Sequence, residues 1–258
     1  MQYESTMAAA MRYLNENGVR DTAVSTITPG QYHTPALAAL MLDESVMPRW
    51  FDGRGSLIIP EAETSTLIFP GFAPLNPFLS EYFAEATFVE SLPLRQTDLD
   101  RPLDVFVIDG AALSDDWREQ FVFVDGAVHV GDTAVLQGYD LRAPTIAPGG
   151  TVQLVTLWQV QNALEGVRLF THVLDAEGAL IAQADRLDAP SEAWVSGDWL
   201  LQLHEFEIPA ETAVGEYPLV VGMYTCLDVF CTQTERFPIT INGEPFGDTF
   251  QLTNLTIE

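Results

Sequence analysis

Residues 127–258 alternate between apolar and polar positions, a pattern typical of antiparallel β-strands. In the run from Val152 to Val160, every second side chain is predicted on one strand face, opposite Gln153 and Gln159, because neighbouring side chains of a strand point to opposite faces. Glycine-containing turns at 148–150, 176–178, 214–215 and 242–243 separate further predicted strands. These strands are 135–141, 169–174, 180–185, 201–208, 216–224, 235–241 and 250–257. The pattern predicts an antiparallel β-sandwich, Ig-like or jelly-roll-like, over residues 127–258.

The first half of the chain mixes helical and strand patterns. Ala8, Met11 and Leu14 recur at helical spacing within a predicted helix over 5–17, which Gly18 ends. Helices are also predicted at 35–42 and 77–86, and strands at 22–27, 46–51, 56–59, 66–69 and 103–109. Such alternation with short connections favours an α/β layer fold. We therefore expect an α+β protein of two domains, an α/β layer domain over 1–126 and a β-sandwich over 127–258.

The composition is strongly acidic, and this excludes some partners. The 258 residues include 37 acidic and 11 basic side chains, a formal net charge of −26, and every basic residue is Arg. Such a surface repels phosphate backbones and anionic lipid headgroups, so we expect no nucleic-acid partner. The acidic residues are scattered and form no calcium-loop sequence. The sequence therefore predicts neither a metal site nor a cofactor.

Cys226 and Cys231 are the only cysteines, with four residues between them. This spacing differs from the Cys-x-x-Cys of redox and zinc motifs, and no second pair could complete a metal site. A disulfide that closes a hairpin loop is expected in an oxidising compartment, where so short a loop would contribute about 2 kcal/mol. Two buried free thiols are the alternative.

Targeting and catalytic patterns are absent from the sequence. Residues 1–6 lack the basic start and apolar core of a signal peptide, and no apolar run approaches the length of about 18 residues that a membrane span needs. If the protein works outside the cytoplasm, we expect its targeting segment upstream of residue 1. No nucleophile elbow, zinc helix or phosphate-binding glycine loop occurs, and the four histidines lie far apart. We expect no catalytic activity from this chain alone, although a hydrolase with its two carboxylates among the 37 acids remains a third hypothesis.

Two segments of the first half are candidate ligand contacts. Residues 28–35 lie between a predicted strand and a predicted helix, where ligands often bind in α/β sheets. His33 would lie at that edge, and Thr34 could cap the helix. In residues 49–54, Arg49 and Arg54 flank two aromatic side chains and Asp52, so this segment could contact an anion or a sugar. The alternatives are a capped loop in the first segment and a glycine turn with an Arg–Asp pair in the second.

Three tryptophans of the second half have different expected roles. Trp158 lies on the apolar face of a predicted strand, so we expect it in the core. Trp194 and Trp199 lie in the polar connection 191–199, where an exposed indole could stack on a sugar ring. The alternative is a loop whose tryptophans fold back over the end of the sandwich.

A set of short motifs, in order along nearly the whole chain, resembles a known family. The motifs of the first half are AAMRYLNE (9–16), YHTP (32–35), RWFDGR (49–54), LIIP (57–60) and IFP (68–70). Those of the second half are LQGYDL (136–141), PGG (148–150) before LW (157–158), THVLDAEG (171–178), QAD (183–185), GEY (215–217) and VGMY (221–224). They resemble the soluble region that follows the last membrane helix of bacterial multi-span glycosyltransferases similar to dolichyl-phosphate-mannose protein mannosyltransferases. The first half resembles this soluble region itself, and the second half is similar to the β-sandwich often appended to those enzymes.

The resemblance implies a location and a role. In that family the catalytic acids lie on loops between membrane helices, so no catalytic residue can be transferred to this chain. The resemblance implies a non-catalytic, extracytoplasmic region, periplasmic or at the cell surface, that shapes or stabilises a sugar or acceptor site. Its partner would be the membrane-embedded portion of the enzyme or a glycan. The alternative is a free-standing carbohydrate-binding or adhesion module, which would use Trp194 and Trp199.

Overall fold

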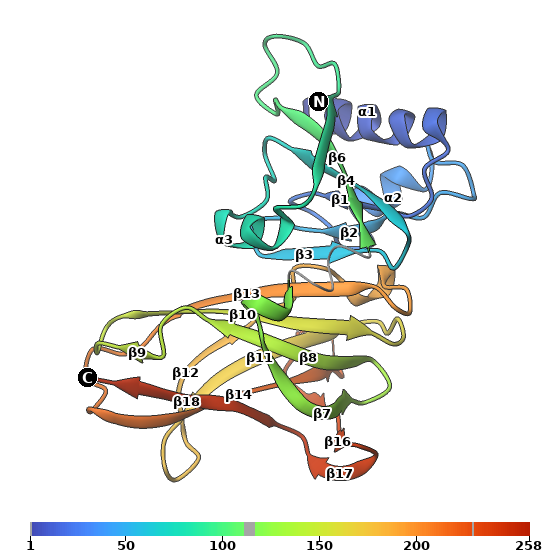
Figure 1. The fold of residues 1–258 in the computed structure, drawn as a ribbon. Helices are drawn as coiled ribbons and strands as arrows, with labels where there is room; N and C mark the ends of the chain where they lie inside the picture. Colours follow the sequence, from blue (N-terminus) through green and yellow to red (C-terminus); the bar gives the residue numbers. More distant parts are fainter. Residues whose placement is uncertain (1, 111–116, 229) are drawn as a thin grey trace. The chain divides into compact units, whose positions relative to one another are not determined.

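The structure is a computed structural model that describes residues 2–110, 117–228 and 230–258 (Figure 1). The chain is mostly β, with 45% of its residues in strands and 14% in helices. It divides into two compact units. The first comprises the residues up to Gln120 together with Asp188–Leu201, and the second comprises Phe121–Leu187 and Gln202–Glu258. The expected boundary at 126 ignored the return of Asp188–Leu201 to the first unit, which no local sequence pattern indicates.

The first unit is built on a five-stranded mixed sheet with the strand order β2-β1-β4-β6-β5. Strand β1 pairs in parallel with β2 and β4, whereas β6 is antiparallel to β4 and β5. The strands are β1 (Thr22–Ser25), β2 (Arg49–Phe51), β4 (Thr64–Pro70), β5 (Thr87–Ser91) and β6 (Leu103–Asp109). A further strand, β3 (Ser56–Ile59), follows β2 in the sequence.

Helix α1 (Gln2–Asn17) covers part of this sheet with the apolar face that the helical spacing predicted. Its buried Met7 and Met11 share a hydrophobic cluster with Val24 of β1 and Ile68 of β4. Gly18 follows the helix with a φ of 60°, a backbone conformation that ends helices and that glycine adopts without strain. This packing fixes α1 beside β1, whose outgoing loop forms part of the candidate site.

The other helices of the first unit are short. Helix α2 (Thr34–Ala38) lies in the connection between the parallel strands β1 and β2. The helix predicted over 77–86 consists of α3 (Pro77–Ser80) and the 3-10 helix η1 (Glu81–Phe83). A second 3-10 helix, η2 (Ser191–Ala193), lies in the returning segment. No helix in the described residues is both long and apolar enough to cross a bilayer.

The second unit is a β-sandwich-like arrangement of two sheets, as the alternating pattern predicted. The strands of one sheet follow the order β17-β16-β7-β8-β10-β13, and those of the other the order β12-β11-β14-β18-β9, with β15 also paired to β14. Val152 and Leu154 of β10 pack with Val173 of β11, Leu219 of β14 and Leu255 of β18 in one hydrophobic cluster, so side chains from both sheets form the core. The strands are β7 (Val122–Val130), β8 (Ala134–Leu141), β9 (Thr145–Ile146), β10 (Thr151–Val160), β11 (Val167–Leu174), β12 (Leu180–Asp185), β13 (Trp199–Glu207), β14 (Gly215–Cys226), β15 (Thr234–Arg236), β16 (Ile239–Ile241), β17 (Glu244–Gly247) and β18 (Phe250–Ile257).

Candidate functional site

A cavity of about 460 Å³ lies within the first unit, along the connection from β1 through α2 to β2. This volume lies in the range of small-molecule sites, roughly 300–1,000 Å³. One wall is the loop after β1, with Pro29 and Gln31, and another is α2 with the turn that follows it. The returning segment closes the cavity with Pro190, Glu192 and Ala193. Three separate stretches of sequence therefore build this site.

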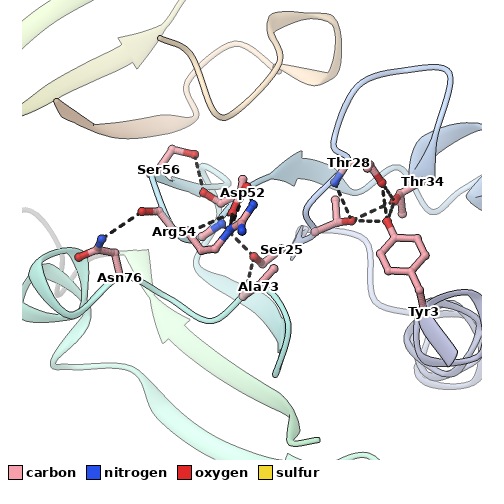
Figure 2. A network of polar contacts seen from close by, with 11 residues as sticks. Tyr3, Ser25, Thr28, Thr34, Asp52, Arg54, Ser56, Ala73 and Asn76 are labelled. Atoms are coloured by element: carbon pink, nitrogen blue, oxygen red, sulfur yellow. Dashed lines mark hydrogen bonds and ion pairs between the residues drawn. The ribbon is translucent and has the colours of Figure 1, made fainter. Parts of the chain in front are cut away.

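A network of hydroxyl groups fixes the loop after β1 to helix α1 (Figure 2). The Tyr3 hydroxyl lies 2.6 Å from Thr26 Oγ1 and 2.6 Å from Thr28 Oγ1, and it is also hydrogen-bonded to Thr34. Thr34 Oγ1 is 2.9 Å from Thr26 Oγ1 and 3.0 Å from Thr28 Oγ1. Thr28 and Thr34 lie at the two ends of this loop, so the hydroxyl network holds both ends in place. The part of the cavity wall that the loop forms is therefore anchored on both sides.

We expect Tyr3→Phe to lower the free energy of unfolding of the first unit by about 1 kcal/mol, the usual net contribution of a hydrogen bond. The loss stays small because the hydroxyls of Thr26, Thr28 and Thr34 still bond one another. Urea unfolding measures the change. Tyr32→Phe, at a side chain that is 81% exposed, is the control and should leave the stability unchanged. Equal losses in the two variants would contradict a role for the network.

The returning segment is held to β2 by a buried ion pair between Arg49 and Asp198. Arg49 Nε and Nη2 donate to the two carboxylate oxygens at 2.9 and 3.0 Å, and the two side chains are only 7% and 0% exposed. Asp198 also accepts hydrogen bonds from the backbone N–H groups of Glu61 at 3.2 Å and Val195 at 3.0 Å. Arg49 was a candidate ligand contact, with a structural Arg–Asp pair inside the turn as the alternative. Its guanidinium instead anchors the returning segment to β2, because a buried guanidinium needs a charge partner.

Trp194 is buried, which excludes the exposed stacking platform and agrees with the alternative that its indole folds back and packs. It is 4% exposed, and its indole N–H donates to the carbonyl oxygen of Ala189 at 2.9 Å. The tryptophan thus braces the short segment that carries Glu192 and Ala193 into the cavity wall. Trp199 is partly buried, and its ring meets that of Trp117 edge to face, with the centroids 5.4 Å apart. Both tryptophans pack within the first unit, whereas the sequence placed them in the sandwich.

The segment around Asp52 forms a turn held by internal bonds (Figure 2). Arg54 Nε and Nη2 donate to the buried Asp52 carboxylate at 2.9 and 2.6 Å, and this hydrogen bonding raises the pKa of Arg54 above its ordinary value. The Gly53 N–H donates to Ser25 Oγ at 2.9 Å, and Ser25 Oγ in turn donates to the Ala73 carbonyl at 2.7 Å. Asp52 and Arg54 therefore form the glycine turn with an Arg–Asp pair that was the alternative to a ligand contact. The Arg54 side chain is still 52% exposed.

His33 is exposed and takes the N-cap position of α2, where its side chain makes no capping hydrogen bond. The sequence placed Thr34 at the cap; that assignment is wrong, because Thr34 is the first residue of the helix and its hydroxyl belongs to the Tyr3 network. His33 itself does not line the cavity, but its neighbours Gln31 and Pro35 do. The segment 28–35 therefore contributes to the cavity through Gln31 and Pro35, and not through His33.

The cavity combines an apolar interior with carboxylates at exposed positions. Ala38, Val46 and Trp50 line it and are buried, whereas Asp43 and Glu44 are exposed. Glu192 adds a third carboxylate, and none of the described lining residues is basic. In the described part of the chain, no group of three or more His, Cys, Asp or Glu side chains is placed to hold a metal ion. Such a surface can hold an apolar group and attract a positive charge.

Two stretches that complete this site, 43–48 and 190–193, could not be identified from the sequence. Residues 43–45 were assigned to no element, 46–48 to the start of a strand, and 191–193 to a polar connection of the second half. The acidic pair Asp43 and Glu44, directly after the predicted helix, was the one available signal. The position of 190–193 beside it depends on the Arg49–Asp198 pair, whose partners are 149 residues apart in sequence.

In the second unit, Cys226 and Cys231 form a disulfide bond that closes the loop after β14. Within this loop the Asp228 carboxylate accepts hydrogen bonds from Thr232 Oγ1 at 2.6 Å and from the backbone N–H groups of Phe230, Thr232 and Gln233. The Thr232 hydroxyl, followed by these N–H groups, lowers the pKa of Asp228 to about 2. The carboxylate thus stays ionised near neutral pH and organises the loop.

Comparisons with known proteins give only distant likenesses. No protein-family model and no curated protein matches the chain. Among solved structures, the C-terminal domain of wzt is 12% identical, with 53% of this chain and 80% of that chain covered and a TM-score of 0.35. A Niemann-Pick type C2 protein from the Japanese carpenter ant is 9% identical, with 54% and 100% covered and a TM-score of 0.31. A β-glucuronidase from glycoside hydrolase family 2 is 14% identical, with 60% and 13% covered and a TM-score of 0.25. Likenesses this weak indicate nothing about function.

Proposed function

We propose that this chain is a non-catalytic, extracytoplasmic region of a membrane glycosyltransferase, in which it shapes or stabilises a sugar or acceptor site. The first unit would be its α/β layer domain and the second its appended β-sandwich. The motifs in order along both halves suggest this role. The observation that carries the proposal is the preformed cavity of the first unit, whose walls are fixed by the Tyr3 network and by the Arg49–Asp198 pair. Its lining suits binding, because most of its side chains are apolar.

The alternative, a free-standing carbohydrate-binding or adhesion module, has less support. It relied on exposed indole faces at Trp194 and Trp199. Trp194 is buried against its own segment, and Trp199 packs on Trp117. A stacking platform needs an open ring face, so these two side chains favour the accessory role.

The coding sequence upstream of residue 1 tests the proposal directly. We expect several membrane-spanning segments there, in the same reading frame or in an adjoining gene. A secretory signal peptide joined directly to residue 1, with no membrane protein alongside, would overturn the proposal in favour of the free-standing module.

A transfer assay tests the non-catalytic part separately. The purified chain is incubated with a polyprenyl-phosphate-linked sugar and an acceptor peptide, and the released lipid phosphate is measured. We expect no release above the rate without protein. Release that scales with the amount of chain would show that the chain itself is an enzyme.

A further inference from the structure

We infer that the cavity of the first unit binds an amphiphilic cation, an apolar chain that ends in an ammonium group. This inference deepens the proposed function, on which it rests, by naming the chemical class that the region would hold. It depends on how polarity is distributed within the cavity. The buried lining residues Ala38, Val46 and Trp50 provide an apolar interior, while the exposed Asp43 and Glu44 provide negative charge near solvent.

The position of the carboxylates sets the orientation of the occupant. Asp43 and Glu44 lie in the turn after α2, and Glu192 lies in η2 of the returning segment, so the charges come from two separate walls. An ammonium group near solvent could interact with both walls and keep part of its hydration, whereas burying it among apolar side chains would carry a large desolvation cost. The apolar chain of the same molecule would displace water from the interior and gain the hydrophobic contribution. Met47, which also lines the cavity and is 69% exposed, extends the apolar surface toward solvent.

The charge of the cavity lining disfavours anionic ligands. The described lining residues offer no Arg, Lys or His to pair with a carboxylate or a phosphate. The whole chain adds a formal net charge of −26, which repels anions at long range and concentrates cations.

Three probes of equal chain length separate these possibilities: n-octylammonium, n-octanol and n-octanoate. Binding to the full chain is measured by isothermal titration calorimetry and by the amide chemical shifts of residues 38–50. We expect octylammonium to bind about tenfold more tightly than octanol, because each exposed carboxylate contributes only a modest attraction, and octanoate not to bind. High salt should remove the advantage of octylammonium and leave octanol unaffected.

Three variants locate the effect. Asp43→Asn, Glu44→Gln and Glu192→Gln combined should weaken octylammonium about tenfold and leave octanol unchanged. A control combines Glu177→Gln, Glu211→Gln and Glu244→Gln, which changes the net charge equally at exposed positions of the second unit, and should retain affinity. Ala39→Trp, at an exposed lining residue, should abolish binding of both probes without disturbing the fold.

Each contrary result overturns the inference. Equal affinity for the three probes would show an apolar cavity without charge selection. Binding that survives Ala39→Trp would place the site elsewhere, and no binding of octylammonium would show that the cavity does not take this class. None of these results bears on the coding sequence upstream of residue 1, so failure of the inference is distinguishable from failure of the proposed function.

Discussion

Asp198→Asn should lower the free energy of unfolding of the first unit by about 3–5 kcal/mol, the usual cost of leaving one partner of a buried ion pair without its counter-charge. The two side chains are 7% and 0% exposed, so water cannot replace the lost carboxylate charge at Arg49. The asparagine keeps the size of the side chain and one oxygen acceptor. The change in the free energy of unfolding therefore measures the missing charge and not a loss of packing volume.

Fluorotryptophan labelling makes the measurement specific to each unit. Of the five tryptophans, Trp50, Trp117, Trp194 and Trp199 belong to the first unit and Trp158 to the second. Urea unfolding followed by fluorine NMR thus gives two separate transitions, which a single averaged signal would merge. We expect the first-unit signals to shift to lower urea and the Trp158 signal to keep its midpoint.

Asp52→Asn is the matched control. Asp52 is also a buried carboxylate paired with an arginine, but its partner Arg54 is 52% exposed and can be hydrated once the charge is lost. We expect a loss of about 1 kcal/mol, as for pairs that solvent reaches. If the two asparagine variants destabilise the first unit equally, burial of the Arg49–Asp198 pair is not what anchors the returning segment.

The Arg49–Asp198 pair marks a part of the fold that could not be predicted from the sequence. The apolar alternation of residues 152–160 and the glycine turns after it predicted most strands of the second unit, because a strand pattern and its turns are local. The 16-residue helix α1 was predicted for the same reason, although it begins at Gln2 and not at Ser5. In contrast, the return of Asp188–Leu201 to the first unit depends on a contact between residues 149 positions apart. No local pattern records such a contact, so Arg49 was a candidate for a ligand contact or a turn with Asp52, and Trp194 a candidate for an exposed platform or for packing on the sandwich.

The candidate site was predicted in part for a related reason. The loop of residues 28–35 was identified from its place after a strand and before a helix, and Pro29, Gln31 and Pro35 do line the cavity. The side chain chosen from it, His33, was selected for its chemistry alone and does not line the cavity. The position of a loop follows from the order of elements, whereas the side chains that face a cavity follow from packing in three dimensions.

His204 should make the second unit sensitive to acid. It is fully buried on β13, and its Nε2 lies 3.0 Å from Thr156 Oγ1, while its Nδ1 has no hydrogen-bond partner among the described residues. Burial, with Arg186 adding to the effect and Asp185 opposing it, lowers the pKa from 6.5 to about 3. Between these two values the unfolded chain binds a proton that the folded chain does not, so acid favours unfolding. The stabilisation is complete above about pH 7 and falls as the pH drops from 6.5 toward 3.

His204→Gln removes this titration and keeps a side chain able to hydrogen-bond Thr156. One pKa unit corresponds to about 1.4 kcal/mol, so from pH 7.5 to pH 4.5 the natural protein should lose about 2.5 kcal/mol more than the variant, measured at Trp158 by the same fluorine method. The other titrating groups are common to both proteins and cancel in this difference. In the folded protein the His204 imidazole signal should stay unchanged down to about pH 4. An imidazole that titrates near pH 6.5 while Trp158 remains folded, or equal losses in the two proteins, would show that His204 is not held neutral in the core.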